Sequence, residues 1–142
     1  MGLLPESTGV RIGQNLQLSA PKEQTSRTYR VDYEAGRVSG FVDRAEAMEQ
    51  AIYKILLTER FAFRIYSWNY GMEWNAVAGK SWPVFESECK RVIREALLAD
   101  DRISAVTDMT VSQIDKRTAA VSFTAQTIFG DIPIERTVDI YV

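Results

Sequence analysis

Glutamate side chains are the strongest candidates for chemistry in this sequence. The chain contains no histidine, which removes histidine-activated serine and cysteine nucleophiles and the usual zinc sites. A pair of carboxylates remains, as in a glycosidase that cleaves peptidoglycan, where one carboxyl protonates the leaving group and the other acts as nucleophile or base. The central candidates for such a pair are Glu59, Glu73, Glu86 and Glu88.

The spacing of these carboxylates does not favour catalysis. Glu86 and Glu88 are two residues apart in a helical pattern, so their side chains point to different sides of the helix. A general acid also needs one glutamate desolvated beside a second that stays ionised, and no such arrangement is visible. Solvated surface charges are the favoured interpretation. Asp100 and Asp101 lack further oxygen ligands at defined offsets, so we expect neither a metal nor a cofactor.

Aromatic residues concentrate in the middle of the chain and offer a second kind of site. Most of them are expected to fill the core, with one or two tryptophans left for a protein interface or for bracing an irregular loop. Trp68 and Trp74 are the candidates for protein binding. A closed apolar pocket beside them would instead indicate a module that binds a small ligand. The cluster consists of Tyr66, Trp68, Tyr70, Trp74 and Trp82.

Bulk composition indicates an ordinary single domain. The 142 residues are 46% hydrophobic and 25% charged, with a net charge of −2, which disfavours a nucleic-acid-binding surface. No apolar run approaches the roughly 20 residues that a membrane helix needs, so no membrane partner is expected. The only cysteine, Cys89, allows no intrachain disulfide, which fits a reducing compartment such as the cytoplasm.

Turn and capping signals divide the chain into an arm and one domain. Residues 1–27 are polar and contain two prolines, so we predict a flexible amino-terminal arm, followed by a single domain over 28–142. An alternating hairpin is predicted over 29–41. Asp43 and Glu46 resemble a capping box that starts the first long helix.

Two further helices and a meander complete the predicted fold. A short helix is predicted over 73–78, and a second long helix begins after Ser81 with the buried stripe Phe85, Cys89, Val92, Ile93, Ala96 and Leu97. Strands are predicted over 103–115, 118–129 and 132–142. A Gly130-Asp131 turn is predicted to join the last two of these strands, and a bulge is expected in the first near Thr107 and Asp108.

The predicted fold class is therefore α+β. The order of elements indicates a mostly antiparallel sheet with two long helices and a short one packed on one face. A polar face remains for solvent, made of Ser122, Thr124, Gln126, Glu135, Thr137 and Asp139.

The last two strands carry the main binding hypothesis. An exposed edge strand accepts a strand from another chain through main-chain hydrogen bonds, and alternate side chains then give specificity. In the final strand, Arg136 interrupts an otherwise apolar face. The residues predicted to contact a partner there are Ile134, Arg136, Val138 and Ile140.

Several segments resemble the sheath-proximal baseplate wedge proteins of contractile phage tails. The resemblance covers about 44–142 and rests on the helical run 51–58, an aromatic run ending in Gly71, and a helix ending in Ile93-Arg94-Glu95-Ala96-Leu97-Leu98 that leads into a strand meander. A narrower resemblance, to XkdS-type proteins of PBSX-like prophages and tailocins, reaches back to about Thr28. It rests on residues 29–40, Thr58-Glu59-Arg60 and Tyr66-Ser67-Trp68-Asn69-Tyr70-Gly71.

One motif departs from the broad family. After its second long helix that family usually carries Glu-Pro-Arg, and this chain has Asp100-Asp101-Arg102. The acid and the arginine are kept, so their charge pairing is expected to persist, whereas a role for the rigid proline turn is not. The resemblance implies that Asp100, Asp101 and Arg102 contact a partner protein.

The resemblance implies a structural role. It implies a baseplate component present in six copies per ring, which links the wedge to the sheath and templates the first sheath ring. The implied partners are the sheath protein and other baseplate wedge proteins, with tube or hub proteins as further candidates. Such a protein resides in the bacterial cytoplasm during assembly and then in the baseplate of a phage tail or tailocin. Members are often labelled lysozyme-like, yet no glycosidase pair is visible, so no enzymatic activity is expected.

Overall fold

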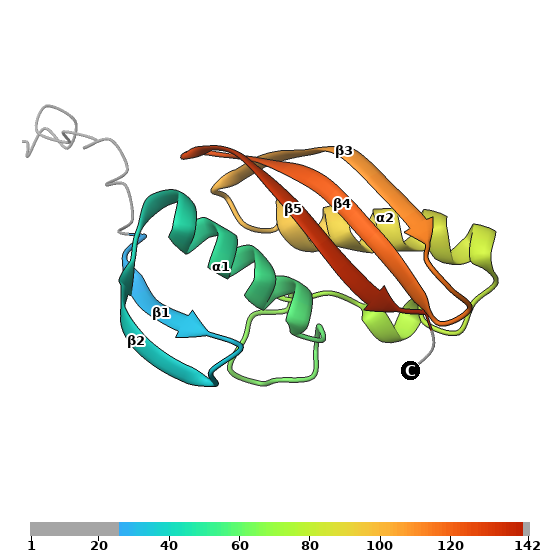
Figure 1. Ribbon diagram of the computed structural model, residues 1–142, viewed down its shortest axis with the longest axis horizontal. Coiled ribbons are helices and arrows are strands. Elements are labelled where there is room, and N and C mark those ends of the chain that lie inside the picture. Colours follow the sequence, from blue (N-terminus) through green and yellow to red (C-terminus); the bar gives the residue numbers. More distant parts are fainter. Residues whose placement is uncertain (1–25, 141–142) are drawn as a thin grey trace, which may run out of the picture.

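The computed structural model describes residues 26–140, and within them the chain has an α+β fold. The arm predicted for 1–27 therefore lies outside the described residues except for its last two positions. Three helical segments and five strands follow one another along the chain (Figure 1). They are β1 (Thr28–Asp32), β2 (Arg37–Val42), α1 (Arg44–Leu57), η1 (Trp74–Ala76), α2 (Trp82–Leu98), β3 (Ile103–Gln113), β4 (Thr118–Thr127) and β5 (Gly130–Asp139).

Strands β3, β4 and β5 form an antiparallel meander with β4 in the centre. Along β4 every second side chain is buried, because these residues face the helices, while the alternate residues stay partly exposed. Figure 1 shows the meander crossing α2, with α1 running beside β5. The sheet thus has one covered and one open face, as predicted. The buried residues of β4 are Ala119, Val121, Phe123 and Ala125.

The apolar stripe of α2 supplies the helical half of the core. All six residues predicted for this stripe are buried, because recurrence at three- and four-residue steps places them on one side of the helix. They pack with the inner face of the meander and with Met48, Ile52 and Ile55 of α1. The prediction for this helix is confirmed.

The predicted single sheet is wrong in one respect, because the first hairpin does not join the meander. Strands β1 and β2 form a separate two-stranded sheet, and α1 lies between this hairpin and β5 (Figure 1). Gln50 of α1 ties the hairpin down: its side chain accepts from Val31 N–H at 3.0 Å and donates to Tyr29 O at 2.8 Å.

The turn before the last strand also differs from the prediction. Strand β4 ends at Thr127 and β5 begins at Gly130, so Ile128 and Phe129 form the turn in place of Gly130-Asp131. Gly130 has φ of 106°, which explains why glycine is needed directly after the turn. Phe123 consequently pairs with Ile134, whereas the predicted turn would place it opposite Val138.

Local signals at the first helix and in β3 give mixed outcomes. Asp43 caps α1 as predicted, but its side chain accepts from the Arg44 N–H. Glu46 pairs with Arg30 of the hairpin instead of completing a capping box. The predicted bulge in β3 is confirmed, since the register shifts between Thr107 and Thr110.

Residues 58–72 form a closed loop between α1 and η1. Its two ends are held by backbone bonds from Met72 N–H to Thr58 O at 2.9 Å and from Arg60 N–H to Met72 O at 3.1 Å. Gly71, with φ of 97°, lies so close to this closure that a Cβ atom there would meet Thr58 O at 2.7 Å. The loop therefore requires glycine for two reasons, its positive φ and the lack of space.

Replacing Gly71 by alanine should destabilise the domain by about 2–4 kcal/mol, because backbone strain and a backbone clash add together. Gly36→Ala is the matched control: φ is 62° there, but a Cβ atom would meet nothing within 4 Å. We expect about 1 kcal/mol for this control. Urea unfolding followed by circular dichroism measures both variants. Equal losses for the two would contradict the role assigned to the loop closure.

Candidate protein-binding site

The outer margin of β5 is a strand edge that pairs with no other strand of the described residues, with α1 beside the strand. Within residues 26–140, β5 pairs with β4 alone. Ile140, which follows β5, donates its N–H to Arg117 O on the β4 side at 2.6 Å. Backbone groups alternate along a strand, so those of Glu135, Thr137 and Asp139 point away from β4. Pro133, which has no N–H, occupies another of these outward positions, where prolines are tolerated in sheets.

A groove runs beside this edge on the inner side of the sheet. Its volume is about 280 Å³, and α1, the segment before η1, and β5 all contribute to it. Most of its lining is apolar, including Leu56, Met72, Trp74 and Val138. Arg136 is the basic residue among the groups that line it. The groove therefore joins an apolar surface, a cation and an open strand edge.

Arg136 has an unusual environment. Its Nη1 atom is buried and has no hydrogen-bond partner among the described residues. The centre of its guanidinium group lies 6.0 Å from the centre of the Tyr53 ring, which gives some cation–π attraction. Burial lowers the pKa of this arginine, because a desolvated cation is less stable than one in water. The arrangement is suited to receiving an acceptor from another molecule.

The other predicted residues of the last strand divide into two groups. Val138 lines the groove, next to Arg136. Ile134 and Ile140 are each 3% exposed and belong to the core, so their side chains are not accessible to a partner. Nothing in the sequence indicated that Leu56 and Met72 line the groove, because neither residue interrupts a pattern.

Asp100 and Arg102 form a compact ion pair in the turn between α2 and β3. Asp100 Oδ2 lies 2.6 Å from Arg102 Nη2, and its Oδ1 accepts from the Arg102 backbone N–H and Nε at 3.0 and 2.9 Å. Burial of Asp100 acts to raise the pKa of its carboxyl, but the hydrogen bonds from Arg102 outweigh it, and the pKa is lowered. The expected charge pairing of this motif is present, and it requires no proline.

Asp101 is the exposed member of the motif. It lies beside a depression of about 480 Å³, which Tyr70 and Ala99 also line. The Asp100 carboxylate is occupied by Arg102 inside the chain, so Asp101 is the carboxylate of this turn with most access to a partner.

The aromatic residues separate into core and surface positions, broadly as predicted. Trp74 packs edge-on against Phe85 of the core, with ring centres 5.8 Å apart. Trp68 is 80% exposed, and its backbone oxygen accepts from Arg60 Nε at 2.7 Å. Other exposed apolar side chains accompany Trp68 on the loop 58–72. They are Phe61, Phe63 and Ile65.

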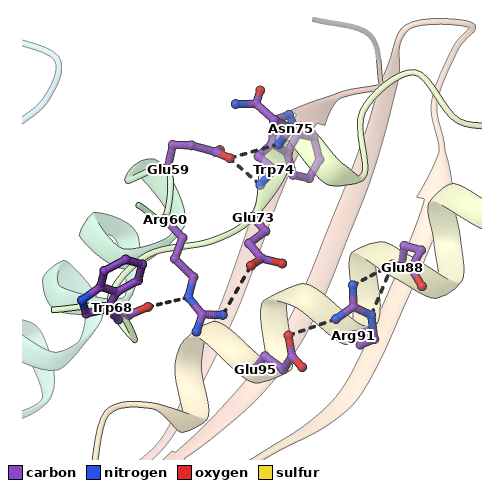
Figure 2. A network of polar contacts seen from close by, with 9 residues as sticks. All are labelled: Glu59, Arg60, Trp68, Glu73, Trp74, Asn75, Glu88, Arg91 and Glu95. Carbon is purple, nitrogen blue, oxygen red and sulfur yellow. Dashed lines mark hydrogen bonds and ion pairs between the residues drawn. The ribbon is translucent and has the colours of Figure 1, made fainter. Parts of the chain in front are cut away.

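The four candidate catalytic glutamates are all engaged in local structure, and Figure 2 shows Glu59, Glu73 and Glu88. Glu59 accepts from the backbone N–H groups of Trp74 and Asn75 and so caps η1, and Glu73 pairs with Arg60 at 3.7 Å. Glu86 pairs with Lys90 on α2. Arg91, at 2.7 Å from Glu88, lowers the pKa of that carboxyl by hydrogen bonding. A general acid needs a raised pKa, so this change is in the wrong direction for catalysis.

Within residues 26–140, no three acidic, cysteine or histidine side chains gather to hold a metal ion. Cys89 is buried in the core, and burial raises the pKa of its thiol to about 12. In the described part of the chain, no helix is long and apolar enough to span a membrane.

Comparison with known proteins identifies the family. The sequence model of the contractile injection system sheath initiators matches residues 26–130. This chain belongs to that family. The phage-like element PBSX protein XkdS of Bacillus subtilis strain 168 is 37% identical over 131 residues, which cover 88% of this chain and 91% of the relative.

Membership confirms the resemblance drawn from the sequence. The two groups named there, baseplate proteins next to the sheath and XkdS-type proteins, correspond to this family and this relative. A sheath initiator is a structural component of a contractile tail, and its role implies contact with sheath and baseplate proteins.

Removing the charge of Asp100 should lower the free energy of unfolding of the sheath initiator, and the loss should be largest at neutral pH. The pKa of Asp100 is below its ordinary value of 3.8 in the folded state. The stabilisation is therefore complete above about pH 4 and is lost as the pH falls through the folded-state pKa. For Asp100→Asn we expect a loss of about 1–3 kcal/mol at pH 7 that shrinks in acid.

Asp101→Asn is the control, because the neighbouring carboxylate is exposed, and its effect should stay within about 0.5 kcal/mol. Denaturant unfolding at a series of pH values measures both variants. A loss for Asp100→Asn that is the same at pH 3 and pH 7 would show that the ion pair is not its cause.

Proposed function

We propose that this sheath initiator links the baseplate wedge to the sheath and templates the first sheath ring by accepting a sheath strand along β5. The observation that supports this most is the open outer edge of β5, which carries exposed residues and pairs with no described strand. Main-chain hydrogen bonds to such an edge hold an added strand in register, and alternate side chains make the contact selective. Six copies arranged in a ring offer six such edges to the first sheath subunits.

The regularity of β5 favours it over the other edge of the meander. Strand β3 is interrupted by two register shifts, and Asp108 within it has φ of 54°. Bulges of this kind bend and twist a strand, which protects an edge from unwanted pairing. Strand β5, in contrast, pairs with β4 without a shift from Gly130 to Asp139. An incoming strand therefore meets a continuous register on β5, with outward donors and acceptors at Glu135, Thr137 and Asp139 and an acceptor alone at Pro133.

The contacts with the baseplate are assigned to surfaces other than β5, namely the loop 58–72 and the turn that contains Asp101. Trp68 and its exposed neighbours on the loop 58–72 offer apolar area of the kind that anchors protein interfaces. Asp101 supplies a charge beside the depression at the end of α2. Other wedge proteins are the proposed partners there, with tube or hub proteins as further candidates. The arm over 1–27 adds contacts in the assembled ring.

No catalytic step is part of the proposed function. Each glutamate considered for a glycosidase instead caps a helix or pairs with a cation. The label lysozyme-like is therefore treated as a misnomer for this chain. The protein is proposed to assemble in the bacterial cytoplasm and to remain in the baseplate of a phage tail or tailocin.

Blocking the β5 edge with proline should abolish docking without unfolding the domain. Thr137→Pro removes an N–H that points outward, so the bonds to β4 are kept and stability should fall by less than about 1 kcal/mol. Binding to the cognate sheath protein should weaken about tenfold or more, because the incoming strand loses a hydrogen bond and meets the proline ring.

Thr137→Ala is the matched control, since it removes the same side chain and keeps the N–H. Biolayer interferometry with purified sheath protein measures the affinity, and electron microscopy of particles measures sheath assembly. Normal affinity and normal sheaths with Thr137→Pro would refute strand addition at β5.

A further inference from the structure

Arg136 lies at a position where a neutral residue would stabilise the isolated domain equally well. It lies on the inner face of β5, between the core residue Ile134 and the groove residue Val138. The guanidinium is half-buried, and its Nη1 is enclosed without an acceptor from residues 26–140. Burying a charged donor without a partner is unfavourable, and an apolar side chain of similar size avoids this cost.

The groove that contains Arg136 lies next to the outer edge of β5, so a strand added there comes close to this arginine. Groove and edge lie side by side, because Thr137, Val138 and Asp139 of β5 line the groove as well. In an added strand, the residue directly opposite Arg136 has its Cβ atom about 4.5–5.5 Å away on the same face of the sheet. That residue points into the groove, toward the unpaired guanidinium.

The surroundings of Arg136 define which side chain suits the opposing position on the added strand. A carboxylate satisfies an arginine better than any other side chain, with short charge-assisted hydrogen bonds. The neighbouring surface, formed by Leu56, Met72, Trp74 and Val138, is apolar. A side chain two positions away on the added strand lies on this surface and is favoured when it is apolar.

We propose that the sheath strand that docks on β5 carries an aspartate or glutamate opposite Arg136, with an apolar residue two positions away against Met72 and Trp74. This inference rests on the proposed function and specifies the partner segment. Arg136 acts as a selectivity residue: it favours one register of the added strand and rejects registers that leave the guanidinium unpaired.

The test replaces Arg136 by methionine, which has similar length and no charge. In the isolated protein the melting temperature should stay within about 2 °C of the wild-type value or rise, because an unpaired buried charge is removed. Binding of purified sheath protein should weaken about tenfold or more, and its dependence on salt should decrease. Arg94→Met, on the exposed side of α2, controls for the change in net charge.

A charge swap identifies the partner group. Arg136→Glu should abolish binding, and replacing the opposing sheath carboxylate by arginine should restore it. The combination of unchanged stability, weakened binding and restoration supports the proposal.

Other outcomes overturn it. A melting temperature lowered by several degrees in Arg136→Met shows that Arg136 already has a partner within its own chain. Wild-type binding by Arg136→Met together with lost binding by Thr137→Pro refutes the carboxylate and retains strand docking. Wild-type binding by both variants refutes the inference and the proposed function together.

Discussion

The alternation of buried and exposed residues along β4 is the constraint on which the rest of the structure depends. Because Ala119, Val121, Phe123 and Ala125 share one face, the meander buries that face against the helices and leaves the other to solvent. A three-stranded sheet covered in this way cannot close on itself, so it ends in two edges. The helices satisfy the apolar face, but they do not provide backbone partners for the edge strands. The fold therefore presents a strand edge as a direct consequence of its core.

The two edges differ in ways that bear on function. The irregular β3 carries bulges and a residue with positive φ. Strand β5 keeps a continuous register and borders an apolar groove, where Arg136 Nη1 has no hydrogen-bond partner among residues 26–140. A chain selected only for stability gains nothing from such an arginine. Membership in the sheath initiator family supplies a reason for it, since these proteins act in contact with other subunits. The family assignment implies partner proteins without naming a surface, and the features of β5 are what support our proposal for this strand.

Periodic patterns allowed much of the fold to be predicted from the sequence. The stripe on α2 and the bulge near Asp108 were predicted because each is a local feature of the pattern. The turn at Ile128 and Phe129 was missed, since Gly130 supplies a positive φ after the turn and not within it. The separation of the first hairpin from the meander was also missed, because alternation predicts a strand without specifying its partner.

The candidate site was only partly predictable for a related reason. Arg136 interrupts an apolar face and was noticed for that, but its neighbours in the fold, such as Tyr53 and the groove residues Leu56 and Met72, come from distant parts of the chain. Asp100 and Arg102 were expected to pair, and they do so within three residues. The sequence did not show that this pairing leaves Asp101 as the more accessible carboxylate of the turn. Interactions within a few residues were predictable, and those that need tertiary contacts were not.

Amide hydrogen exchange along β5, measured by NMR with and without the sheath protein, tests the central claim most directly. In the isolated domain, the amides of Arg136 and Val138, which face β4, should be protected, whereas those of Glu135, Thr137 and Asp139 should exchange rapidly. With sheath protein bound, all five amides should be protected, because an added strand supplies acceptors for the outward groups. Rapid exchange of Glu135, Thr137 and Asp139 in the complex would contradict the account.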